Sequence, residues 1–172
     1  KESMEKLKEK LKKLSKDADD DALIFAGRYF LHTDKAKQSR QCLEKIYTKN
    51  PNQVQTLVML GWLNLNSGQS RQARQALNFF EAALKLTKDK QDIGALLGRS
   101  KYYERSAKNS SSSVADARKK WDRVLDDLNT IIVLYPNFAP AVIEKARVLM
   151  IMNQWDESLQ TAQRVLRKDP KD

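Results

Sequence analysis

The feature that most constrains this chain is an internal repeat with a period of about 34 residues. Gly27 and Gly61 stand 34 residues apart, and each has a leucine four positions before it. Gly98 follows after 37 residues and Ala146 after a further 48. The pattern predicts four copies of one unit, with about 3 residues inserted into the second copy and about 14 into the third.

The second half of each unit carries apolar or small residues at positions i, i+4 and i+7, which is the spacing of one face of an amphipathic helix. The four stripes are Ser39-Leu43-Ile46, Ala76-Phe80-Ala83, Val124-Leu128-Ile131 and Ser158-Ala162-Val165. Pro51, Pro136 and Pro170 follow three of the stripes, where a proline ends a helix. A single pair of helices cannot bury its own apolar face, so the units must stack on one another.

The sequence therefore predicts an all-α protein, a right-handed α-solenoid of about four tetratricopeptide-like helix pairs with an extra N-terminal helix. We expect a helix or arm over 1–20 and a solenoid over 21–172, with repeats at 21–52, 53–90, 91–137 and 138–170. The expected helices are 21–33, 36–49, 53–66, 70–86, 91–107, 114–135, 139–152 and 155–168, and the two insertions are expected in the turns inside the second and third pairs. The amphipathic stretch 3–15 could cap the solenoid, continue it upstream or form a mobile arm.

The sequence gives little support for an enzyme. The chain has one histidine, His32, and one cysteine, Cys42, which is too few soft ligands for a metal site built on them. It has no glycine-rich phosphate loop and no nucleophile elbow. We expect no enzyme activity and no cofactor, and we interpret Cys42 as a buried or half-buried apolar residue.

The first helices of the pairs are expected to line a concave groove. The residues that follow the small position there are Arg28, Trp62, Arg99 and Arg147, and Tyr102 lies one turn further on. Forked arginine donors and flat aromatic rings in register could clamp an acidic or extended peptide. The alternative is that these arginines pair with neighbouring acids or cover the core with their stems.

An acidic pair and two tryptophans on the second helices also have expected positions. The acidic pair Asp126 and Asp127 is expected on the solvent side of its helix. Trp121 and Trp155 open second helices, where packing between repeats is the expected role.

The formal net charge of +10 suggests an acidic partner. The densest basic segment, Arg99 to Arg123, is interrupted by acids and has no recognised nucleic-acid motif. A basic helical-repeat module that binds nucleic acid or other acidic partners therefore remains the alternative function, with a protein or anionic membrane surface the more economical contact. We expect no signal peptide and no transmembrane segment. Because the sequence begins at Lys1 rather than Met, we expect it to be a piece of a longer protein.

Several stretches carry a closer resemblance to a known family. They are Ala22 to Gly27, Leu84 to Gln91, Ala95 to Gly98, Thr130 to Val133, Tyr135 to Ala141 and Gln154 to Arg164. Over residues 22–170 the chain resembles the N-terminal region of the tetratricopeptide repeat protein 21 family, which supplies the large repeat subunit of intraflagellar transport complex A. The N-terminal 20 residues and the serine-rich insertion at 107–116 stand outside this resemblance.

The resemblance implies a structural role. It implies a superhelical scaffold that holds protein partners in cilia, in a train that carries cargo chiefly in the retrograde direction and helps membrane receptors to enter the cilium. The implied partners are other complex A subunits and ciliary cargo adaptors, and the implied location is the cilium and the cytoplasm, in association with the cytoskeleton. The family has no catalytic motif to carry over.

Overall fold

The computed structural model describes residues 19–88, 90–109 and 113–168, and in these ranges the only regular structure is α-helix. The helices are α2 (Asp20–His32), α3 (Ala36–Lys49), α4 (Val54–Asn66), α5 (Ser70–Leu86), α6 (Ile93–Lys108), α7 (Val114–Leu134), α8 (Ala139–Ile151) and α9 (Trp155–Lys168). The prediction of an all-helical solenoid of four helix pairs is confirmed. The helix expected over 3–15 and the stop at Pro170 lie outside the described residues.

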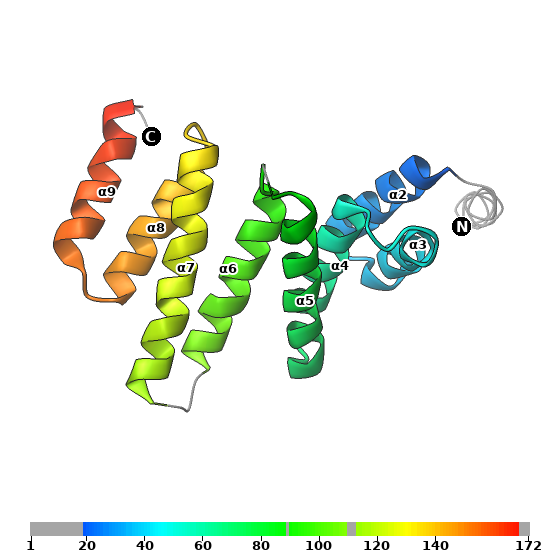
Figure 1. The fold of residues 1–172 in the computed structure, drawn as a ribbon, viewed down its shortest axis with the longest axis horizontal. Coiled ribbons are helices and arrows are strands. Elements are labelled where there is room, and N and C mark those ends of the chain that lie inside the picture. Colours follow the sequence, from blue (N-terminus) through cyan, green and yellow to red (C-terminus); the bar gives the residue numbers. More distant parts are fainter. Residues whose placement is uncertain (1–18, 89, 110–112, 169–172) are drawn as a thin grey trace.

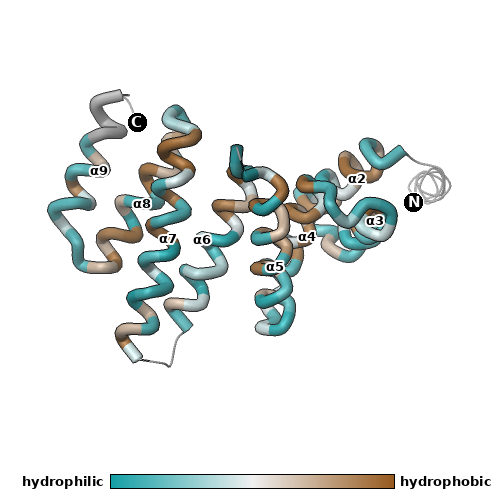
Figure 2. Tube along the Cα trace, viewed as in Figure 1, coloured by the Kyte–Doolittle hydropathy of each residue, from teal (hydrophilic) through white to brown (hydrophobic). Residues whose placement is uncertain are grey.

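The helices stack as consecutive pairs along the length of the molecule (Figure 1). In each pair the two helices pack closely together, and the second helix then packs against the first helix of the next pair. First helices also contact one another, α2 with α4 and α4 with α6. As a result α4 is enclosed by α2, α3, α5 and α6, and it is mostly apolar along its length (Figure 2).

The turn inside a pair is the same in three of the four repeats. Each turn has one residue with a positive φ: Asp34 at 55°, Gly68 at 79° and Asn153 at 59°. This left-handed region is readily adopted by glycine and tolerated by asparagine and aspartate. Gly68 supplies this conformation in the second pair, and the equivalent turns of the first and fourth pairs are built on Asp34 and Asn153.

The inserted residues mostly lengthen helices, which corrects the expectation that both insertions lie in turns. The turn at 67–69 is as short as the one at 33–35, so the additional residues of the second pair belong to the first turn of α5. In the third pair α6 and α7 have 16 and 21 residues, against 13 and 14 in α2 and α3. The connection at 109–113 takes only a small part of the insertion.

A repeated hydrogen bond ties the helices of the first and last pairs together. The Ser39 hydroxyl donates to the carbonyl oxygen of Gly27 at 2.7 Å, and the Ser158 hydroxyl donates to that of Ala146 at 2.9 Å. Both serines are buried, and each begins the apolar stripe of its second helix. The small residue on the first helix allows the close approach that this bond requires.

The core consists of two clusters of buried side chains that meet at α5. One cluster joins the first two pairs around Leu43, Ile46 and Leu60, and the other runs from α4 to α8 around Phe80. The Phe80 ring is fully buried against Gly61 and Gly98, where a Cβ atom would overlap it. Phe79, half-buried, packs against both clusters.

The two tryptophans that open second helices differ in their surroundings. Trp121 packs against the larger core cluster, as expected. Trp155 belongs to the last described pair and is 59% exposed within this chain, so its packing between repeats stays a prediction. Ile143 and Met150 of α8 and Leu159 of α9 are exposed as well.

Candidate protein-binding site

The five residues predicted to line a concave groove lie on the first helices α2, α4, α6 and α8, where their surroundings differ. Arg28 is exposed on α2 and has no ion pair among the described residues. Trp62 packs edge-on against Phe80 at 5.8 Å between ring centroids, and its indole Nε1 donates to the carbonyl oxygen of Gly94 at 3.2 Å. Trp62 thus joins α4 to α6 from within the fold.

Arg99 is held by a buried carboxylate in its own helix pair. Its Nη2 lies 2.6 Å from Oδ1 of Asp127, and its Nε also donates to that carboxylate. The side chains are 28% and 3% exposed, respectively. The expectation that Asp127 faces solvent is therefore wrong, because α7 turns it inward toward α6; Asp126 is exposed as expected.

The pKa values of this pair reflect unequal burial. Burial raises the pKa of Asp127 by more than the hydrogen bonds and charge of Arg99 lower it. Burial opposes the charge of Arg99, but the hydrogen bonds and charge of Asp127 outweigh it and raise the arginine pKa. In this ion pair, each group offsets the cost of burying the charge of the other.

Arg147 belongs to a network of charges that joins α6 to α8. Its Nη2 lies 2.6 Å from Oε2 of Glu144 and 2.9 Å from Oε1 of Glu104. Glu104 also accepts hydrogen bonds from Lys101 at 3.0 Å and from Lys108 at 2.8 Å. Burial alone would raise the pKa of Glu104, but these partners outweigh it and lower the pKa to about 2.

The remaining predicted site residue, Tyr102, packs edge-on against Tyr103 at 5.4 Å between ring centroids and contacts the larger core cluster. Four of the five predicted residues thus make contacts within the fold, and the alternative that arginines pair with neighbouring acids describes Arg99 and Arg147. Arg28 alone stands exposed, and its role in binding a partner stays a prediction. A charge reversal at Arg99 or Arg147 would disturb packing before it reported on binding.

The basic segment in the third pair is largely neutralised within the fold. Arg99, Lys101 and Lys108 have carboxylate partners, and Arg105 donates to the carbonyl oxygen of Leu65 at 2.9 Å. The exposed cations that remain in the described part of this pair, such as Arg118, Lys119 and Arg123, lie on α7. Over the described ranges no group of three or more possible ligands could hold a metal ion, and no helix has the length and apolarity to cross a membrane.

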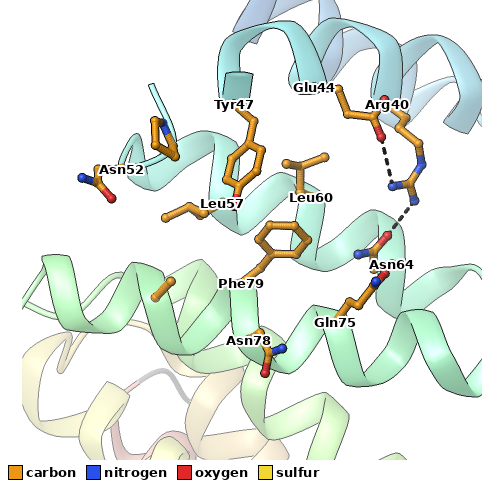
Figure 3. A pocket seen from close by; sticks show the side chains of 12 residues that line it. Arg40, Glu44, Tyr47, Asn52, Leu57, Leu60, Asn64, Gln75, Asn78 and Phe79 are labelled. Atoms are coloured by element: carbon orange, nitrogen blue, oxygen red, sulfur yellow. Dashed lines mark hydrogen bonds and ion pairs between the residues drawn. The ribbon is translucent and has the colours of Figure 1, made fainter. Parts of the chain in front are cut away.

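A hollow of about 510 Å³ lies between α3 and α5, above α4; we call it the α3–α5 groove (Figure 3). Tyr47 of α3 and Phe79 of α5 face each other across it, edge to face, with ring centroids 5.6 Å apart. Leu57 and Leu60 of α4 lie on either side of the two rings in the same view. The volume is within the range of small-ligand and side-chain pockets.

Polar side chains occupy the two ends of the α3–α5 groove (Figure 3). At one end Arg40 donates to Oδ1 of Asn64 at 2.6 Å and lies 3.7 Å from the carboxylate of Glu44. Gln75 and Asn78 line the α5 side, exposed and without a partner among the described residues. The remaining lining residues are Pro51, Asn52 and Ala82.

The α3–α5 groove lies between second helices, whereas the sequence pattern predicted a binding surface on the first helices. The available signal was on the second helices. Arg40, Glu44 and Tyr47 have the i, i+4, i+7 spacing of a second face on α3, beside the stripe of Ser39, Leu43 and Ile46. An arginine and an aromatic residue on a face next to the core stripe indicate a surface that a partner could use.

The stacked pairs, the repeated turns and the absence of strands in the described ranges define a helical-repeat protein of the tetratricopeptide type. Two solved structures share this fold. A thermophilic tetratricopeptide repeat protein of Thermus thermophilus matches with a TM-score of 0.74 and 14% identity over 88% of this chain and 75% of its own. The protein MamA matches with a TM-score of 0.63 and 17% identity over 84% of this chain and 74% of its own.

The family is narrower than the fold. The model described as "Tetratricopeptide repeat protein 21 N-terminal ARM repeat" matches residues 1–159. The chain is 31% identical to tetratricopeptide repeat protein 21B of Xenopus laevis over 98% of its length, and 28% identical to that of Homo sapiens over 93%. The chain therefore belongs to the tetratricopeptide repeat protein 21 family. It spans 12% and 11% of the lengths of these two relatives.

The family match corrects one boundary of the sequence analysis. Residues 1–20 were expected to stand outside the resemblance, but the match begins at residue 1. The matched range also contains the serine-rich insertion at 107–116. Both segments therefore lie inside the range that the family model matches.

Proposed function

We propose that this chain is a scaffold segment of the intraflagellar transport complex A machinery in cilia, where it mediates protein–protein interactions for retrograde transport and ciliary cargo trafficking. Membership of the tetratricopeptide repeat protein 21 family along nearly the whole chain carries this proposal. The partners are other complex A subunits and ciliary cargo adaptors, and the location is the cilium and the cytoplasm beside the cytoskeleton.

The architecture supports a binding role rather than a catalytic one. Stacked helix pairs offer long surfaces to other proteins, and stability builds up from contacts between neighbouring repeats. The Arg99–Asp127 pair joins the two helices of the third pair, and the charges around Glu104 join the third pair to the fourth. The α3–α5 groove and the exposed apolar residues of α8 and α9 remain open to partners.

The test uses the intact protein in ciliated cells. Cross-linking mass spectrometry on the purified assembly should link exposed lysines of this segment, such as Lys37 and Lys85, to other complex A subunits. A control preparation from cells that lack the protein sets the background. Recovery of the folded protein without any complex A subunit would contradict the proposal.

A further inference from the structure

The α3–α5 groove has the features of a side-chain pocket with a charged approach at one end. Its floor consists of Leu57 and Leu60, each 2% exposed, and its walls are the rings of Tyr47 and Phe79. Tyr47 keeps 37% of its surface exposed even though it contacts Phe79. An apolar side chain placed against the open side of this ring pair would bury that surface.

Positive charge gathers at the Arg40 end of the groove. Lys37 lies on α3 one turn before Arg40, and Arg71 lies on α5 one turn before Gln75, so both continue the faces that line the groove. Lys37 and Arg71 are exposed and have no ion pair among the described residues. Neither α3 nor α5 has an acidic residue in its first turn, so the partial positive charge of both helix N-termini adds to the field.

Carboxylates that could balance this end are few. Glu44 is the one acidic residue among those described as lining the groove, and it lies 3.7 Å from Arg40. The third and fourth pairs differ in this respect, because Arg99 and Arg147 there are matched by Asp127, Glu104 and Glu144. The unmatched charge on α3 and α5 is therefore available to a partner of opposite sign.

We propose that the α3–α5 groove binds an extended acidic peptide segment of a partner protein, with an apolar side chain against the rings of Tyr47 and Phe79 and acidic side chains at the Arg40 end. This inference rests on the proposed scaffold function and names the partner chemistry of one surface. Gln75 and Asn78 both donate and accept hydrogen bonds, which suits the alternating N–H and C=O groups of an extended backbone.

The spacing of the peptide follows from the helix. Tyr47 and Arg40 are two turns apart on α3, which is about 10 Å at ~1.5 Å per residue. An extended chain advances about 3.3 Å per residue, so the first acidic residue falls about three positions from the apolar one. Lys37 and Arg71 lie beyond Arg40 and would meet a second acidic residue one or two positions further on.

The experiment measures binding of fluorescein-labelled peptides to this chain by fluorescence anisotropy. The probe is the nonapeptide Ser-Gly-Leu-Ser-Ser-Asp-Ser-Asp-Gly, and the reversed sequence is tested beside it so that both chain directions are covered. Competitors are a peptide of the same composition with the leucine moved next to an aspartate, and a peptide with lysine in place of aspartate. We expect binding of the probe or its reverse, at least about tenfold tighter than either competitor.

Matched variants separate the groove from bulk charge. Tyr47→Ser should weaken the probe about tenfold and Arg71→Gln about fivefold. The controls Tyr29→Ser and Arg118→Gln change an exposed tyrosine and an exposed arginine elsewhere, and they should leave binding unchanged. Asn78→Asp places a negative charge in the groove without removing any packing, so it should weaken binding of the acidic probe. This variant keeps the test decisive if Tyr47→Ser fails to fold.

Three results would overturn the inference. They are equal binding of the probe and the rearranged peptide, equal weakening by Arg71→Gln and Arg118→Gln, and full displacement of the probe by a single-stranded oligonucleotide of the same charge. The scaffold proposal is judged separately, by recovery of complex A subunits with the intact protein carrying Tyr47→Ser and Arg71→Gln. Continued recovery together with failed peptide binding would contradict only the assignment of this groove.

Discussion

The α3–α5 groove and the junctions of α6 with α7 and α8 belong to the same repeat pattern, yet they treat charge in opposite ways. At the α6 junctions the cations that reach a neighbouring helix meet carboxylates, as in the Arg99–Asp127 pair and the contacts around Glu104. Around the α3–α5 groove, Lys37 and Arg71 have no such partner among the described residues. The repeat fixes where side chains lie. Whether a cation at such a place meets a carboxylate of the same chain decides whether it stabilises the fold or stays available to bind a partner.

The largest expected effect tests the core that both regions share. Phe80→Ala removes a fully buried ring that packs against α4 and α6. The cavity should lower the free energy of unfolding by about 3–5 kcal/mol. Urea denaturation followed by circular dichroism measures it, with Phe25→Ala, whose ring is 73% exposed, as a control expected to cost under about 0.5 kcal/mol.

The next effect tests the ion pair between α6 and α7. Arg99→Ala leaves Asp127 buried without its partner, and we expect a loss of about 2–4 kcal/mol, moderated because Arg99 is partly exposed. The double variant Arg99→Met with Asp127→Leu removes both charges and should recover most of that loss. If the single variant costs no more than the double one, the pair does not hold the junction together.

The third prediction uses pH to examine the junction of α6 and α8. The pKa of Glu104 is lowered to about 2 from an ordinary 4.5, so its ionised form stabilises the fold above the ordinary pKa. That contribution should be lost as the pH falls from about 4.5 to about 2. Glu104→Gln should cost about 1–2 kcal/mol at pH 7.

The comparison with wild type supplies the control for this third prediction. Urea midpoints measured from neutral pH down to the lowered pKa of Glu104 should differ at the neutral end and converge at the acid end. A difference that stays constant across the range would show that the network acts through packing and not through the charge of Glu104.

The fold was predictable from the sequence because repetition supplies its own check. Gly27, Gly61 and Gly98 mark the close approach of helices, and stripes such as Ser39-Leu43-Ile46 mark the second helix of each pair. These signals depend on local spacing, which the sequence shows directly. The helix ends agree with the expected ones to within two residues.

The functional surface was less predictable, because the rotation of each helix against its neighbours is not a local property. Arg28, Trp62 and Arg99 hold equivalent places in the repeat, yet one is exposed, one packs on Phe80 and one pairs with Asp127. Their surroundings depend on which residue the second helix presents: Asp127 in the third pair corresponds to Phe79 in the second and Cys42 in the first. In the third pair, the greater length of α6 and α7 also changes which residues of neighbouring helices meet.

The smallest expected effect concerns the α3–α5 groove and completes the contrast. Tyr47→Ser removes a ring that is 37% exposed and makes one edge-on contact with Phe79, so it should cost about 0.5–1.5 kcal/mol of stability. Arg71→Gln removes an exposed charge without an ion pair among the described residues and should fall within about 0.5 kcal/mol of wild type. Residues that a fold does not need for cohesion, but that combine aromatic area with unmatched charge, are those that a partner can use. Thermal unfolding of both variants beside Arg99→Ala measures this directly. If Tyr47→Ser destabilised the chain as much as Arg99→Ala does, the groove would be part of the core, and the distinction between the two regions would fail.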